Sequence, residues 1–326
     1  MSSNLVGTPK FYIDAILLAR QWGMVYDLNS NAINFFHLNP ANITDLNIPI
    51  DGKDYISLYF RKRYFLNSLS HYFVLGHNFN TDNISHRIFG YAQPDGSHIF
   101  SDRAIPSLNG WKKYNLGTGD DPAGNIETSM DLTRLVIEIT GTGDTTTKLG
   151  EISAGWSYSM PHSPDLELTL NFDNESIKTQ TTKGGHTLSN AGWNHQPVWN
   201  RKAAWVKGAG DSESDDFDHY RIYPSGRRSW NLKFSYLDKT DMFSENFFHN
   251  DEEHYGIFNF TSSGFSVKED WLNSVWFSTN CGQLPFIFQP NQSEEEYAIC
   301  RFSGTPSFKQ VANGVYDISL DIVETW

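Results

Sequence analysis

Short segments in which apolar and polar residues alternate recur along the chain, and they predict β-strands. In the last of them, residues 315–326, apolar residues at every second position alternate with Asp317, Ser319 and Asp321. Successive side chains of a strand point to opposite faces, so this segment is expected to be a strand that is buried on one face. Four further segments alternate in the same way: residues 55–60, 135–139, 166–172 and 230–236.

Two segments in the N-terminal half depart from this period of two. Residues 72–75 form a continuous apolar run, which is typical of a strand that is buried on both faces. Residues 15–22 fit either a short helix or a continuation of the strand before them, and Gly23 ends the segment.

A helix is predicted in the C-terminal half. Residues 267–276 carry apolar side chains at helical spacing. Ser266 and Glu269 fit a capping box, in which each side chain accepts from a backbone amide at the start of the helix. Gly282 lies where the helix is expected to end.

The composition is that of an all-β protein. Aromatic residues make up 15% of the 326 residues and charged residues 19%, which is typical of many short strands joined by turns. The formal net charge of −13 would repel a phosphate backbone, so nucleic-acid binding is not expected. The N-terminal region has neither a signal-peptide pattern nor an apolar run long enough to cross a bilayer. We therefore expect synthesis in a cytoplasm and no membrane insertion.

The segments divide the chain into two predicted β-sandwich domains and an arm. Residues 1–30 are the arm, which could dock on its own sandwich or on a neighbouring subunit. Residues 31–160 form the first domain and residues 161–326 the second, separated by a connector with two prolines within four residues. A polar, glycine- and tryptophan-rich insertion at about 179–225 is the best candidate for a surface that contacts another subunit.

Motifs that carry chemistry are absent from the sequence. No nucleophile elbow or phosphate-binding glycine loop occurs. The acidic run 211–218 lacks the spacing of a calcium loop, and His249 and His254 lack that of a helical zinc pair. Cys281 and Cys300 could face each other on adjacent strands, although two buried free thiols fit better. The sequence thus predicts no enzyme, no metal and no cofactor.

The order of segments at the C-terminus resembles a known family. An apolar segment, 284–290, ends at a proline, and an acidic loop and the segment 297–302 follow it. The final strand closes the chain. This order resembles the C-terminal β-sandwich of distal and minor tail proteins of long-tailed bacteriophages. The resemblance implies a tail-type sandwich with one packed helix in residues 161–326.

A second resemblance concerns the first domain. Residues 72–79, 134–139 and 148–152 are similar to strands of the discoidin or galactose-binding-like jelly roll. This resemblance implies that His77 and Asn78 could line a ligand loop, although a pair that caps a turn is the more common case.

Two groups of residues are candidates for a subunit interface. Trp193, Trp199 and Trp205 are spaced six apart in the polar insertion, where contact with another subunit fits better than stacking on a sugar. Arg227 and Arg228 are candidate donors of ion pairs across subunits, although solvated surface arginines are more common. Trp230 lies in the inward phase of its strand and is assigned to the core.

These expectations combine into one function and two alternatives. The resemblance implies a non-enzymatic structural protein of a phage tail, located in the virion at the distal tail, tail tip or next to the baseplate. Its partners would be copies of itself and other tail proteins, assembled into an oligomeric ring. One alternative is a carbohydrate-binding adhesin for host-surface glycans. The other, which the sequence supports least, is a polysaccharide-degrading enzyme.

Overall fold

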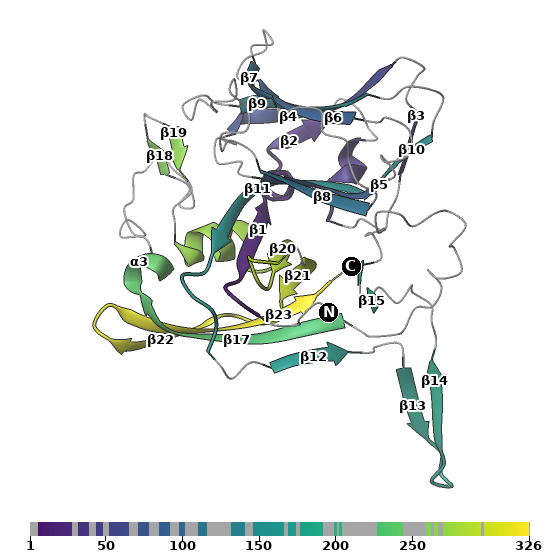
Figure 1. Cartoon of the computed structure of the whole chain (residues 1–326), viewed down its shortest axis with the longest axis vertical. Coiled ribbons are helices and arrows are strands. Elements are labelled where there is room, and N and C mark those ends of the chain that lie inside the picture. The colour runs from purple at the N-terminus through teal and green to yellow at the C-terminus, as the bar shows by residue number, and fades with distance from the viewer. Residues whose placement is uncertain are drawn as a thin grey trace.

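Most of the secondary structure is antiparallel β-sheet, which confirms the predicted all-β fold class. The structure is a computed structural model (Figure 1). It describes residues 6–27, 32–38, 44–47, 52–64, 71–77, 85–91, 98–101, 110–115, 132–140, 146–165, 169–173, 177–191, 199–200, 202–203, 227–243, 259–261, 264–266, 270–294 and 297–325.

A ten-stranded sheet runs through the molecule and takes strands from both halves of the chain (Figure 1). Strand β22 (Ser307–Ala312) pairs with β23 outside the main order. The main order is β12 (Thr169–Asp173), β17 (Arg227–Asp238), β23 (Val315–Glu324), β21 (Ala298–Phe302), β20 (Phe286–Gln289), β1 (Lys10–Asp14), β11 (Glu151–Ser159), β5 (His71–His77) and β8 (Gly110–Asn115).

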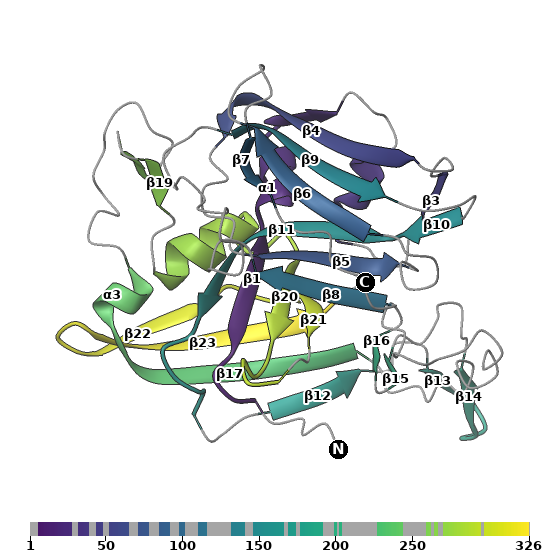
Figure 2. The same ribbon diagram turned by 45° about the horizontal axis from the view of Figure 1, so that its top comes forward.

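A five-stranded sheet faces the end of the main sheet that carries β5 and β8, and the two sheets enclose apolar side chains (Figure 2). Its strands, in order, are β2 (Val25–Asp27), β4 (Lys53–Tyr64), β9 (Leu132–Thr140), β6 (Ser85–Tyr91) and β7 (His98–Ser101). Four short pairs complete the strands: β3 (Thr44–Asn47) with β10 (Thr146–Leu149), β13 (Ile177–Thr181) with β14 (Thr187–Ala191), β15 (Trp199–Asn200) with β16 (Lys202–Ala203), and β18 (Asn259–Thr261) with β19 (Gly264–Ser266).

The N-terminal arm docks on its own chain. Strand β1 lies between β11 of the N-terminal half and β20 of the C-terminal half and pairs with both. It approaches β11 so closely that a Cβ at Gly155 would lie 1.8 Å from the carbonyl oxygen of Ile13, so only glycine fits there. The halves are thus joined by a continuous sheet as well as by the connector at 159–165, and the predicted domain boundaries stay a prediction.

The segment after β1 is a helix, which decides between the two possibilities that the sequence left. Helix α1 (Ala15–Gln21) begins at Asp14, whose side chain accepts hydrogen bonds from two backbone amides. It ends at Gly23, whose φ of 67° is a left-handed conformation that glycine adopts at little cost. A short 3-10 helix, η1 (Ala32–Phe35), follows β2.

The C-terminal helix exists, but its predicted start is wrong. Ser266 lies in strand β19, and the helical turns are η3 (Leu272–Trp276) and η4 (Phe277–Thr279). The carboxylate of Asp270, not Ser266, accepts the backbone N–H of Asn273 at 2.9 Å. A four-residue helix, α3 (Lys239–Met242), follows β17.

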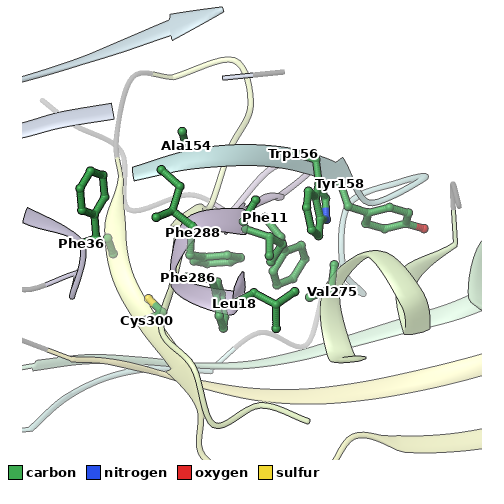
Figure 3. Close-up of a cluster of buried hydrophobic side chains, with 14 of the residues drawn as sticks. Phe11, Leu18, Phe36, Ala154, Trp156, Tyr158, Val275, Phe286, Phe288 and Cys300 are labelled. Carbon is green, nitrogen blue, oxygen red and sulfur yellow. The ribbon is translucent and has the colours of Figure 1, made fainter. Parts of the chain in front are cut away.

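The core beneath β1, β20 and β21 is rich in aromatic side chains (Figure 3). Phe11, Phe286 and Phe288 are fully buried, with ring centroids 5.3 to 5.6 Å from Phe11. Trp230 is 3% exposed, as its strand phase predicted, and its ring meets Phe288 edge-on. Each such ring contributes roughly 2 kcal/mol by leaving water. This core joins strands from both halves of the chain.

Candidate functional site

A β-hairpin projects from the molecule at the start of the predicted insertion (Figures 1 and 2). Strands β13 and β14 pair in register from Ile177 with Ala191 to Thr181 with Thr187. The turn between them closes through a hydrogen bond from the N–H of Thr182 to the carbonyl of His186, at 2.8 Å. It contains Gly185 with a φ of 82°, a conformation that requires glycine here. Turn chemistry and β-branched threonines thus specify this hairpin locally.

The hairpin is exposed on both faces. Residues 179–188 are solvent-exposed except for the half-buried Thr182, and Leu188 keeps 59% of its surface in water. Within the described part of the chain, β13 and β14 pair only with each other. An isolated two-stranded hairpin is marginally stable in water. A partner surface that covers Leu188 would stabilise the hairpin.

A second projection lies at the end of the main sheet that carries β22. Strand β22 is exposed except at Phe308, and Val311 keeps 40% of its surface in water. A register shift between Gln310 and Ala312, together with the exposed Lys309, interrupts this edge. Bulges and lysines are how proteins protect edge strands from pairing with other chains. The bulge and Lys309 therefore make the β22 edge a poor site for strand pairing with another chain.

Strand β17, which pairs with β23, carries an exposed aromatic residue at a β-bulge. Tyr236 is 79% exposed and has a φ of 63°, which is unusual for a bulky residue. Its backbone N–H donates to Oδ1 of Asp317 at 3.1 Å, and this bond holds the bulge. The alternation predicts Tyr236 in the same inward phase as Trp230, but the register shift between Phe234 and Leu237 inverts the phase and exposes it.

Arg228 is not free to form an ion pair with another subunit. Its Nη2 lies 2.8 Å from Oε1 of Glu324, whose side chain is fully buried, and Arg228 itself is only 13% exposed. Its guanidinium also lies over the ring of Trp230, 5.1 Å from the centroid. The register explains the pair, since Ser229 opposes Val323 and the next position outward brings Arg228 to Glu324. The expected cross-subunit or solvated role of Arg228 is therefore wrong, while Arg227 is half-buried beside it.

The other predicted site residues fall outside what the structure describes. His77 ends β5 and Trp199 begins β15, but only their backbones are described. Asn78, Trp193 and Trp205 lie outside the described residues altogether. The ligand loop and the tryptophan interface therefore stay predictions.

The two cysteines are free, and they differ in environment. Cys300 is buried, and burial followed by the nearby Glu324 carboxylate raises the pKa of its thiol. Cys281 is exposed, so the expectation of two buried thiols is wrong for this residue. It follows η4 within three consecutive residues of positive φ, Asn280 to Gly282, a tight turn that leaves its side chain in solvent.

No group of three or more histidine, cysteine, aspartate or glutamate side chains that could hold a metal ion occurs among the described residues. A helix long and apolar enough to cross a bilayer is likewise missing from the part of the chain that the structure describes.

One sequence signal for the projecting hairpin was present. Thr-Lys-Gly-Gly-His-Thr at 182–187 follows alternating residues, the pattern of two strands joined by a glycine turn. Exposure of Leu188 could not be read from it, because burial depends on whether another layer covers the hairpin.

Comparisons with known proteins identify no family. No protein-family model matches the chain, and no curated protein matches it. The chain aligns with the solved structure of a truncated AlyQ with CBM32 and alginate lyase domains, at 10% identity over 98% of this chain and 99% of that one, with a TM-score of 0.26. A similarity this low carries no argument about fold or function.

Proposed function

We propose that the protein is a non-enzymatic structural subunit of a bacteriophage tail, which assembles with copies of itself into a ring. The observation that carries the proposal is the projecting β13–β14 hairpin with its exposed Leu188. It lies in the insertion that the sequence marks as a candidate contact surface. The order of segments at the C-terminus supports the tail assignment through the resemblance to distal and minor tail proteins.

The proposed mechanism is assembly through the β13–β14 hairpin. The hairpin of one subunit would dock on a different surface of the next subunit, so that the contact is heterologous. A heterologous contact closes into a ring when its rotation divides a full turn. Burial of Leu188 in such a contact would contribute roughly 2 kcal/mol per subunit.

The first experiment measures the mass of the purified full-length protein in solution by light scattering, with negative-stain images of the same sample. Rings or short tubes are expected, and their symmetry gives the number of subunits. A monomer at every concentration tested would contradict self-assembly into a ring.

Two matched variants locate the contact. Leu188→Glu places a charge on the exposed face of the hairpin and is expected to weaken self-association by at least about tenfold. Val311→Glu makes the same change at an exposed aliphatic residue of the other projection and should leave the rings intact. Dissociation by Val311→Glu with no effect of Leu188→Glu would move the contact to β22 and overturn the assignment to the hairpin.

A further inference from the structure

Asp14 is a buried carboxylate with uneven hydrogen bonding. The residue is 2% exposed, and its Oδ1 accepts from the backbone amides of Ile16 and Leu17, each at 2.9 Å. The hydroxyl of Ser153 lies near enough to favour the charged form. However, Oδ2 is buried, and no described residue makes a hydrogen bond of normal length and angle to it. Half of this carboxylate is therefore desolvated without compensation.

Charged and titratable groups from three elements lie around Asp14 and Arg20. From β11, Glu151 contributes a second carboxylate, which is fully buried. From α1, Arg20 contributes a guanidinium: burial lowers its pKa, and the Asp14 and Glu151 carboxylates both oppose that effect. From the segment after η1, His37 lies 3.4 Å from Nη2 of Arg20, and its pKa is lowered by burial and by that cation. Both carboxylates thus act on the Arg20 guanidinium.

This cluster lies where the two halves of the molecule join. Asp14 ends β1, the strand between β20 and β11, and it also begins α1. Glu151 begins β11 and opposes Leu75 of β5. Nη1 of Arg20 donates to the carbonyl of Phe36, so the cluster also holds the segment after η1. These side chains therefore connect β1, α1, β11 and the segment after η1.

We propose that Asp14, Glu151 and Arg20 form a proton-sensitive joint, which is tight when Asp14 carries a proton and looser when it is ionised. A proton on Asp14 removes a buried charge whose Oδ2 has no hydrogen-bond partner among the described residues. Loss of the proton restores that uncompensated charge at the contact between β1, α1 and β11. The joint would operate whether or not the chain assembles.

The direction of the pH dependence follows from burial. Desolvation raises the pKa of Asp14 from 3.8 to about 6, against the smaller opposing effects of its hydrogen bonds and of Arg20. The folded protein therefore binds this proton more tightly than the unfolded chain, and the stabilisation is lost as the pH rises from about 4 to about 6. A shift of this size changes the unfolding equilibrium constant by about 100-fold in total, of which roughly 30-fold falls between pH 4.5 and pH 8.

The test compares urea unfolding of the full-length protein and of Asp14→Asn between pH 4.5 and pH 8. Asparagine keeps an oxygen that can cap α1 but has no proton to lose. The ratio of the two unfolding constants is expected to change by roughly 30-fold across this range, with the variant relatively more stable at pH 8. Parallel pH profiles for the two proteins would overturn the proposal.

A local measurement and a control complete the test. Hydrogen exchange at the amides of Ile16 and Leu17, corrected for the intrinsic rate, should accelerate above pH 6 in the wild type only. Asp14→Ser, which also caps helices, replaces Asp14→Asn if the latter fails to fold. Asp238→Asn changes the exposed residue before α3, which makes no side-chain cap, and should leave the pH profile unchanged. Equal acceleration at Ile16 and Leu17 in wild type and variant would also overturn the proposal.

Discussion

Two clusters of buried carboxylates differ in how the charge is neutralised. At the C-terminal end of the main sheet, Glu324 accepts from the backbone N–H, Nε and Nη2 of Arg228 at 2.8 to 3.3 Å, and both of its oxygens are used. At the joint, Asp14 accepts through one oxygen only, and it shares Arg20 with Glu151. In the first cluster one arginine engages both oxygens of the carboxylate, whereas in the second Oδ2 of Asp14 has no hydrogen-bond partner among the described residues.

The two clusters are expected to respond to different changes, the first to loss of a partner and the second to pH. A buried carboxylate with bidentate pairing is stable in its charged form, so the pair fails only when a partner is removed. A buried carboxylate whose desolvation is not fully compensated responds to protons instead. The Arg228–Glu324 pair therefore holds the register of β17 and β23, whereas the stability of the joint changes with pH.

The largest expected effect comes from breaking the C-terminal pair. Arg228→Leu leaves the Glu324 carboxylate buried without its cation, and such a change typically costs about 3–5 kcal/mol. Urea unfolding at pH 7 should show this loss in the free energy of unfolding.

The matched control removes both charges at once. Arg228→Leu combined with Glu324→Leu should recover most of the loss, because apolar residues of similar size can replace a buried pair at little cost. A double variant as unstable as Arg228→Leu alone would mean that packing of Arg228 on Trp230, not its charge, stabilises this end of the sheet.

A smaller effect, with a sign set by pH, is expected at the joint. Asp14→Ala loses the helix cap, which costs about 1 kcal/mol, but it also removes the buried charge. The variant should be close to neutral at pH 4.5 and more stable than the wild type by roughly 2 kcal/mol at pH 8.

Comparison with Asp14→Asn separates the two contributions. Because asparagine keeps the cap, it should exceed alanine in stability by about 1 kcal/mol at every pH. If Asp14→Ala were equally destabilising at both ends of the pH range, the carboxylate would act as a cap alone.

The strands of the molecule could be predicted from the sequence to a large extent, because their signals are local. Alternation gave β23 and β17, and Ile318, Leu320 and Trp230 are buried as the phase required. The position of β1 could not be predicted, since a single chain does not show which strands will accept a new neighbour. The close crossing at Gly155 is visible only once β1 is in place.

The candidate site was less predictable for a related reason. The polarity of the insertion predicts a candidate contact surface, but exposure of Leu188 depends on whether another layer covers the hairpin. Arg228 was misassigned because its partner is 96 residues away in sequence and is brought opposite by register. Asp14 stood before a helix-compatible segment, which is a capping signal, but its burial comes from β11 and could not be seen.

The smallest expected change in stability comes from substituting Cys281. The thiol of Cys300 then reports on opening of the Arg228–Glu324 cluster. Cys300 opposes Glu324 in the register of β21 and β23, and it is buried with its pKa raised, whereas Cys281 is exposed. A thiol reagent should therefore modify Cys281 alone in the folded protein and both thiols after unfolding. Cys281→Ser should change stability by less than about 0.5 kcal/mol and leave no rapidly reacting thiol. In that background, Arg228→Leu should accelerate modification of Cys300, and Asp14→Asn at pH 8 should not. Acceleration by both changes would show that the two clusters open together and are one cooperative unit.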